Sequence, residues 1–165
     1  MLCSFCGYEN LEGADHCDEC QASLTHEGGM PNPTEGWQKK IMKDTIRKVG
    51  VREPLITKPS GTVKQVVQKM KETGNGCVLV MEDGKLAGIF TERDLLHKLG
   101  RPGVDLSDYA VEQMMTASPE VLSEDDTIAY ALNKMAMGNF RHVPIEKSDG
   151  SFYTLSVHDV LRYVF

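Results

Sequence analysis

The feature that most constrains this chain is an internal repeat, in which residues of the second half match residues 65 positions earlier. The matched pairs are Pro54 and Pro119, Thr62 and Thr127, Lys69 and Lys134, Met70 and Met135, Asp94 and Asp159, and Leu96 and Leu161. A duplicated unit of this size buries too little apolar surface to be stable alone. We therefore expect the two copies, residues 51–108 and 109–165, to pack against each other with pseudo-twofold symmetry.

Each copy has the same predicted order of elements: strand, helix, strand, strand, helix. Apolar residues at i, i+3, i+4 and i+7 predict the first helix of each copy. These stripes are Val63, Val66, Val67 and Met70, and Ile128, Ala131, Leu132 and Met135. Two short strands joined by a turn with Asp and Gly follow, and then a closing helix. The strands are Cys77–Met81 and Leu86–Phe90, then His142–Glu146 and Ser151–Leu155, and the closing helices are Thr91–Leu99 and Ser156–Val164. The predicted fold class is α/β (α+β).

Four of the five cysteines lie within the first 20 residues, as two C-x-x-C pairs separated by ten residues. They are Cys3, Cys6, Cys17 and Cys20. Two such knuckles can complete a tetrahedron of thiolates around one ion, which favours a structural zinc site. Iron, as in a rubredoxin-like electron carrier, is the alternative, although those carriers usually separate their cysteine pairs more widely. A four-thiolate site has no open position for a substrate, so the predicted metal stabilises the fold of residues 1–24.

The segments between the cysteines and the repeat differ in composition. Residues 25–36, THEGGMPNPTEG, contain three glycines and two prolines and are predicted to be a linker. Trp37, Ile41, Thr45 and Val49 are spaced by four among lysines and arginine, so residues 37–50 are predicted to form a basic amphipathic helix.

The charge distribution argues against binding to polyanions. The chain has 165 residues and a net charge of −6, which disfavours broad contact with nucleic acid or an anionic membrane. Residues 1–24 contain five acidic residues and no lysine or arginine, so a protein partner is the better candidate for that segment. The uninterrupted apolar strands have five residues and the chain starts without a secretion signal, so we predict a cytoplasmic protein with no membrane contact.

The beginning of each closing helix carries a hydroxyl and an aspartate three residues apart, Thr91 with Asp94 and Ser156 with Asp159. This spacing is that of a helix capping box, which needs no ligand. The same groups could bind a nucleotide, because a helix N-terminus and a hydroxyl receive a phosphate and a carboxylate accepts from ribose hydroxyls. Gly88, three residues before Thr91, would leave room for a sugar or base, whereas Tyr153 occupies that position in the second copy.

These residues resemble a known family. The runs Gly88-Ile-Phe-Thr-Glu-Arg-Asp94, Tyr153-Thr-Leu-Ser-Val-His-Asp159 and Phe140-Arg-His-Val-Pro-Ile145 are similar to those of a tandem cystathionine-beta-synthase (CBS) domain pair, the Bateman module. Residues 1–24 resemble a short zinc ribbon. The resemblance implies two clefts for an adenine nucleotide or another adenosyl compound. It assigns Gly88, Thr91, Asp94, Arg141 and His142 to the first, and Gly76, Cys77, Ser156 and Asp159 to a weaker second cleft.

The functional hypothesis is a regulatory ligand-binding module with a zinc ribbon for partner contact. No Ser/His/Asp order, lysine-containing phosphate loop or H-E-x-x-H motif occurs, which argues against an enzyme. The alternatives are a ligand-free interaction adaptor and an accessory subunit of an enzyme of nucleotide metabolism. A homodimer is also predicted, because the closing helices carry many apolar residues. They are Leu95, Leu96 and Leu99, and Val157, Val160, Leu161, Val164 and Phe165.

Overall fold

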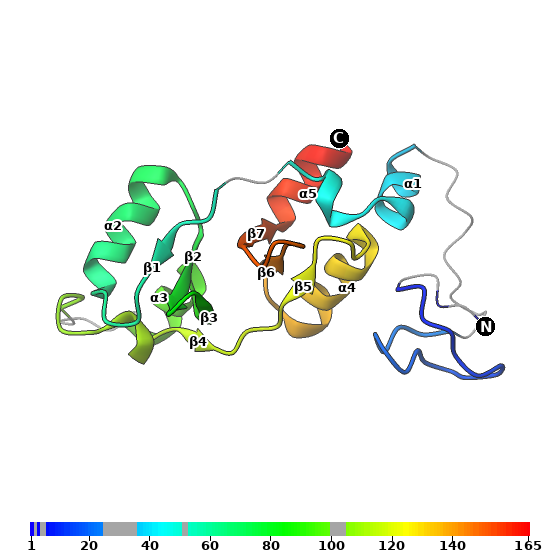
Figure 1. Ribbon diagram of the computed structural model, residues 1–165, viewed down its shortest axis with the longest axis horizontal. Coiled ribbons are helices and arrows are strands. Elements are labelled where there is room, and N and C mark those ends of the chain that lie inside the picture. Colours follow the sequence, from blue (N-terminus) through cyan, green and yellow to red (C-terminus); the bar gives the residue numbers. More distant parts are fainter. Residues whose placement is uncertain (2, 4–5, 25–35, 51–52, 100–104) are drawn as a thin grey trace. The chain divides into compact units, whose positions relative to one another are not determined.

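The computed structural model describes residues 1, 3, 6–24, 36–50, 53–99 and 105–165, so the predicted linker lies almost entirely outside the described residues. After the cysteine-rich segment come helix α1 (Gly36–Lys43) and the 3-10 helix η2 (Ile46–Lys48) (Figure 1). The elements of the first copy are β1 (Ile56–Thr57), α2 (Val63–Thr73), β2 (Cys77–Glu82), β3 (Lys85–Thr91) and α3 (Glu92–Leu99). Those of the second copy are η3 (Val111–Gln113), β4 (Thr116–Ala117), β5 (Leu122–Ser123), α4 (Ile128–Gly138), β6 (His142–Glu146), β7 (Phe152–Ser156) and α5 (Val157–Val164).

Both copies have the predicted order of strand, helix, strand, strand, helix, so the fold class is confirmed. The first sheet has the order β1-β2-β3-β4 and the second β5-β6-β7. Strand β1 is parallel to β2, whereas β2 and β3 form an antiparallel hairpin. Strand β4, which the sequence analysis did not predict, adds two residues of the second copy to the free edge of β3.

The starts and ends of the two long helices follow local chemistry. Thr62 and Thr127 precede α2 and α4, and each hydroxyl accepts a hydrogen bond from the backbone N–H three residues later. Gly74 and Asn139 end the same helices with φ of +66° and +53°, the left-handed region that glycine and asparagine tolerate best. Each of these residues is therefore the C-terminal cap that separates a long helix from the strand that follows it.

The compact units of the fold do not coincide with the two copies in the sequence. Unit A contains residues 1–51, 122–143 and 155–165, and unit B contains residues 52–121 and 144–154. Helix η2, which precedes the first copy, packs in unit A with α4 of the second copy, and η3, at the start of the second copy, packs in unit B with α2 of the first. Ile46 N–H donates to the carbonyl of Asp126 in unit A, and Val111 N–H donates to Gly61 in unit B, both at 2.8 Å. These two hydrogen bonds are related by the 65-residue offset. The equivalent short segments η2 and η3 therefore each lie in the unit that contains the long helix of the other copy.

The prediction of one helix over residues 37–50 is wrong. Helix α1 is Gly36–Lys43, and η2 is a separate 3-10 helix, Ile46–Lys48. Thr45 lies between them in an extended conformation (φ −80°, ψ 159°) and pairs with Thr127. Ile46 and Val49 are buried, with exposed fractions of 0% and 1%. The free energy gained by burying Ile46 and Val49 beside the start of α4 exceeds what a continued helix would contribute, so α1 ends before them.

The core of unit B is built by the predicted apolar stripe and strands. It consists of buried residues from α2, β2, β3 and η3, which are Val63, Val66, Met70, Val78, Val80, Phe90 and Val111. A second cluster, formed by Cys77, Leu79 and Ile89, receives Phe152 from the β6–β7 hairpin. Among the described residues, no helix is long and apolar enough to cross a lipid bilayer.

Candidate functional site

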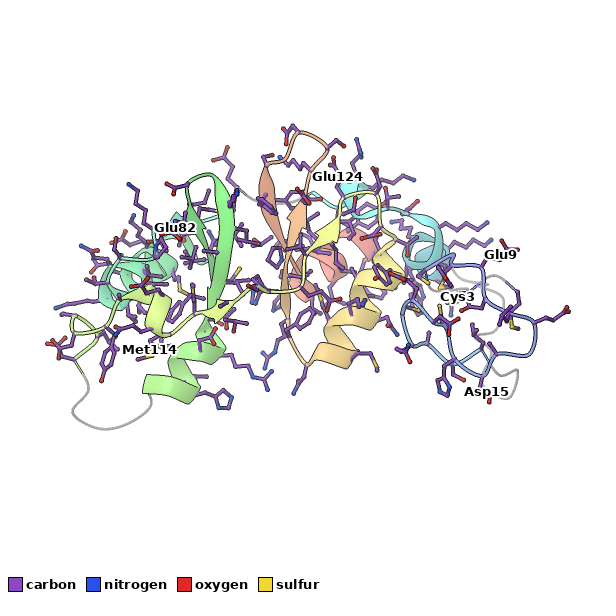
Figure 2. All side chains as sticks on the ribbon, turned by 60° about the horizontal axis from the view of Figure 1, so that its bottom comes forward. Cys3, Glu9, Asp15, Glu82, Met114 and Glu124 are labelled. Atoms are coloured by element: carbon purple, nitrogen blue, oxygen red, sulfur yellow. The ribbon has the colours of Figure 1, made fainter. Side chains whose placement is uncertain are left out.

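The four cysteines at the N-terminus form two matching turns. In the first, Gly7 N–H donates to the carbonyl of Cys3 (2.9 Å), and in the second Gln21 N–H donates to that of Cys17 (2.8 Å). Gly7 and Gln21 each follow the second cysteine of their pair, and both have positive φ, +75° and +60°. The left-handed residue turns the chain back, so that both sulfur atoms of a pair face the same point. Figure 2 shows sulfur atoms gathered around Cys3.

The sulfur positions fit one tetrahedral metal ion. The Sγ atoms of Cys3 and Cys20 are 3.6 Å apart, and those of Cys6 and Cys17 are 3.5 Å apart. All four lie within 4.8 Å of one another. A Zn–S bond of about 2.3 Å gives a tetrahedron edge of about 3.8 Å, close to these separations. The predicted ligand set is therefore brought together, and four thiolates leave no coordination position open.

The thiols of this cluster have unequal acidities. Burial raises the pKa of Cys17, but N–H donors from Cys20, Asn10 and Glu19 outweigh it and lower that pKa to about 6. Burial raises the pKa of Cys6 and of Cys20. A metal ion must therefore displace protons from some of these sulfurs when it binds, which makes metal loading pH-dependent.

One residue of this site was missed by the sequence analysis. Asn10 has an exposed fraction of 5%, and its side-chain amide donates to the Tyr8 carbonyl (3.0 Å) and to Cys17 Sγ (3.4 Å). Its Oδ1 accepts from the backbone N–H of Asp18 (2.9 Å). A lone asparagine among exposed acidic residues carries no sequence signal of burial, so only the folded geometry identifies it.

The cysteine cluster packs against helix α4. Tyr130 of α4 packs against the cluster of buried residues that is formed by Cys3, Cys17, Cys20 and Ala22. The ammonium group of Lys134 lies 5.3 Å from the centroid of the Tyr130 ring. Burial raises the pKa of the Tyr130 hydroxyl. The acidic residues of the segment are exposed, and Glu9 and Asp15 are labelled in Figure 2.

The start of α3 is a complete capping box. Thr91 donates from its N–H (2.9 Å) and from its hydroxyl (2.8 Å) to Asp94 Oδ2, and Asp94 N–H donates to Thr91 Oγ1 (3.4 Å). The hydroxyl of Thr116 in β4 lies 3.5 Å from the other carboxylate oxygen, Oδ1. The Thr–Asp spacing therefore forms the helix cap that the sequence allowed. A nucleotide bound here would have to compete with the hydrogen bonds between Thr91 and Asp94.

The start of α5 repeats this geometry in the second copy. Ser156 N–H donates to Asp159 Oδ2 (2.9 Å), the Ser156 hydroxyl donates to the same oxygen, and Asp159 N–H donates to Ser156 Oγ (3.2 Å). Both aspartates are only partly exposed. The fold therefore presents the same polar group twice, at the two junctions between a hairpin strand and its closing helix.

The remaining predicted cleft residues lie beside these two helix starts. In unit B, Glu92 N–H donates to the carbonyl of Gly76 (3.1 Å), and Cys77 pairs with Thr91 in the β2–β3 register. In unit A, Val157 N–H donates to the carbonyl of Arg141 (3.2 Å). Each strand start thus adjoins the helix of its own copy. The crosswise grouping, with Arg141 and His142 beside Asp94 and Gly76 and Cys77 beside Asp159, joins residues of different units and stays a prediction.

Gly88 and its counterpart Tyr153 both serve local packing. A Cβ atom on Gly88 would collide with the Met115 side chain and lie 2.9 Å from the carbonyl oxygen of Thr116. The absent side chain therefore allows β4 to pair closely with β3. Tyr153 has an exposed fraction of 3%, and the ammonium group of Lys147 lies 5.4 Å from the centroid of its ring.

The duplicated hairpin-and-helix architecture can be compared with known proteins. The sequence model of the CBS domain matches residues 46–101 and 111–165. The chain belongs to the CBS domain family. The two matched segments confirm the tandem CBS pair, and they begin at η2 and η3, the segments that the two units exchange.

Relatives and solved structures agree with this assignment. The chain is 30% identical over 123 residues to an uncharacterized 17.7 kDa protein of Acidianus ambivalens, which covers 73% of each protein. It is 36% identical over 104 residues to the CBS domain-containing protein CBSCBSPB1 of Arabidopsis thaliana, covering 63% of this chain and about a fifth (19%) of that protein. An uncharacterized conserved protein from Pyrococcus horikoshii superposes with a TM-score of 0.67 and 28% identity, covering 73% of this chain and 92% of the other.

Proposed function

We propose that the CBS pair is a regulatory module that binds an adenine nucleotide or another adenosyl compound at the starts of α3 and α5. The observation that carries the proposal is the pair of matching groups, Thr91 with Asp94 and Ser156 with Asp159. Each follows a strand directly, so a hydroxyl, a carboxylate and the first N–H groups of a helix are held together. These are groups that recognise a phosphate and a ribose diol.

In this proposal, the first site uses Gly88, Thr91 and Asp94 with Arg141 and His142. The carboxylate of Asp94 accepts from the two ribose hydroxyls and gives up part of its contact with the Thr91 hydroxyl. The phosphate then lies near the Thr91 hydroxyl, where a guanidinium and an imidazole add favourable charge. The second site, with Gly76, Cys77, Ser156 and Asp159, is the weaker one, because Tyr153 occupies the position of Gly88 and its neighbouring strand residues add no cation.

Calorimetry with AMP, ADP, ATP, S-adenosylmethionine and NAD tests the proposal. We expect at least one of them to bind the parent chain and Asp94→Asn to weaken that binding about 10- to 100-fold, because hydrogen bonds to a charged acceptor contribute about 1.5–3 kcal/mol. Glu92→Gln is the matched control, since it removes the same charge from an exposed side chain in the same helix turn. Asp159→Asn should weaken binding less than Asp94→Asn.

The second candidate function is a ligand-free interaction adaptor. It is supported by the two capping boxes, in which each aspartate already bonds to the hydroxyl and N–H of its own helix start. Failure of every compound in the panel to bind the folded parent chain would contradict the nucleotide proposal and leave the adaptor. Both candidates act by binding and not by catalysis.

The N-terminal segment is proposed to be a zinc ribbon. Cys3, Cys6, Cys17 and Cys20 would hold one Zn²⁺ ion, and the ion would contribute structural stability and no catalytic step. The ribbon's exposed acidic residues would then meet a protein partner, because five carboxylates in a segment without lysine or arginine repel nucleic acid.

A homodimer through α3 and α5 is the proposed assembly. Leu96, Leu161 and Phe165 support it, with exposed fractions of 73%, 47% and 83%. Two of the apolar residues that motivated the prediction are not available for it, since Val160 and Val164 are buried at 2% and 7%. The side chain of Leu99 lies outside the described residues.

A further inference from the structure

The cysteine-rich segment contains one buried polar side chain that is not among the four predicted metal ligands. Among the described residues, only Asn10 and Glu124 are polar and buried, at 5% and 9% exposure. Glu124 has Arg47 as its ion-pair partner at 3.3 Å. The Asn10 side chain lies between the two cysteine knuckles, and its hydrogen-bond partners are the Tyr8 carbonyl, Cys17 Sγ and the backbone N–H of Asp18. Burial of an amide is unfavourable unless its polar atoms are satisfied, so its contacts deserve a physical reason.

All the hydrogen-bonding groups of the Asn10 side chain are used. One Nδ2 hydrogen bond goes to the carbonyl of Tyr8, just after the first knuckle (3.0 Å), and the other to Cys17 Sγ (3.4 Å). Its Oδ1 accepts from Asp18 N–H inside the second knuckle (2.9 Å). The side chain therefore cross-links the exit of the first knuckle to the second knuckle, and it fixes how the two cysteine pairs face each other.

The hydrogen bond from Asn10 Nδ2 to Cys17 Sγ also affects the charge of the metal site. Four thiolates around a divalent cation carry a net charge of −2, and residues 1–24 contain no lysine or arginine to offset it. Five exposed carboxylates in the same segment add to the negative field. A neutral N–H donor directed at a sulfur stabilises the anionic ligand without adding a charge. Such outer contacts commonly change metal affinity 10- to 100-fold.

We propose that Asn10 is a positioning residue of the metal site, which stabilises the Cys17 thiolate through Nδ2 and holds the second knuckle in register through Oδ1. The proposal rests on the metal-binding role of the four cysteines. It predicts that the loss of the donor alone, with the acceptor kept, weakens the site.

The test is a cobalt titration of the full chain, followed by competition with zinc. Asn10→Asp keeps the size and the Oδ1 acceptor but removes the N–H donor. We expect it to lower metal affinity 10- to 100-fold and to shift the thiolate-to-cobalt charge-transfer band, because one sulfur loses its hydrogen bond. Asn10→Ala, which removes all three side-chain hydrogen bonds, should lose at least as much affinity.

Leu11→Asp is the matched control, because it adds the same charge without changing the number of heavy atoms, on a side chain of the same segment that is 81% exposed. Its affinity should stay within threefold of the parent, with an unshifted band. Equal affinity and an unshifted band in the parent and Asn10→Asp overturn the role of Asn10 and leave the metal site standing. A parent chain without a thiolate–cobalt band overturns the metal site itself, and the two failures are thus distinguishable.

Discussion

At the scale of single residues, Gly88 and Asp94 each had two explanations in the sequence, one through a ligand and one through local structure. The sequence suggested that Gly88 leaves room for a ligand, and the structure shows that it leaves room for Met115 and Thr116 of the same unit. For Asp94, the sequence allowed either a contact with a ribose or a helix cap, and the structure contains the cap. Asn10 could not be predicted at all, because its burial depends on how two distant turns face each other.

A first prediction concerns Gly88. Gly88→Ala should destabilise the chain by about 1–3 kcal/mol, because the added methyl group must displace Met115 or separate β4 from β3. Urea unfolding followed by circular dichroism measures the change. Gly36→Ala is the control, since no atom lies within 4 Å of its added Cβ. Equal stability of Gly88→Ala and the parent would show that the β3–β4 contact is not tight in solution.

At the scale of elements, local patterns predicted what depends on local burial. The apolar stripes of α2 and α4 and both hairpins were placed within one or two residues, because their periods come directly from side chains facing a core. The end of α1 at Lys43 was not predicted. It depends on hydrogen bonds from Ile46 to Asp126 and from Ile128 to Asp44, partners about 80 residues apart. Strand β4 was missed because two residues carry no detectable alternation.

A second prediction concerns the contact that ties the end of α1 to α5. Tyr163 donates from its hydroxyl to Asp44 Oδ2 at 2.8 Å, and Lys48 lies 2.6 Å from the other oxygen. Tyr163→Phe should destabilise the chain by about 1 kcal/mol. Lys48 first, and then Tyr163, hold the pKa of Asp44 below its ordinary value.

The sign of the pH dependence follows from that direction. A carboxyl with a lowered pKa in the folded chain contributes stability above its unfolded pKa of about 3.9, and the contribution is lost as pH falls below it. The stability difference between the parent and Asp44→Asn should therefore shrink between about pH 5 and pH 3. Urea unfolding at several pH values measures it. A difference that is constant over this range would contradict a lowered pKa for Asp44.

At the scale of the whole molecule, the repeat was predictable and its partition into units was not. The family match begins at residue 46 and at residue 111, and these starts are the segments exchanged between units A and B. A sequence offset shows that two segments are alike, but it does not show which copy each of them packs with. The same limit applies to the proposed crosswise nucleotide sites, which would need residues of both units.

A third prediction concerns removal of the metal. The chain should contain one equivalent of zinc, and a chelator should unfold residues 1–24 while the CBS pair stays folded, because binding of structural zinc contributes about 10–16 kcal/mol to folding of such segments. Tyr130, whose pKa burial raises, should then titrate closer to its ordinary value. Metal analysis and an ultraviolet titration of Tyr130→Phe against the parent measure both effects. Loss of all helical signal on chelation would contradict independent folding of the pair.

The last prediction concerns the oligomeric state. An exposed Leu161 on α5 and an exposed Phe165 just after it, next to Trp37 at a ring-centroid distance of 5.8 Å, place apolar surface in water, and a second chain would cover it. We expect a dimer at micromolar concentration by light scattering, and Leu161→Glu should convert it to a monomer, because a carboxylate buried in an interface has no partner there. Leu11→Glu is the matched control, since Leu11 is 81% exposed in the cysteine-rich segment and should leave the dimer intact. A monomeric parent, or a Leu161→Glu variant that remains dimeric, would show that this helix is not the contact surface between chains.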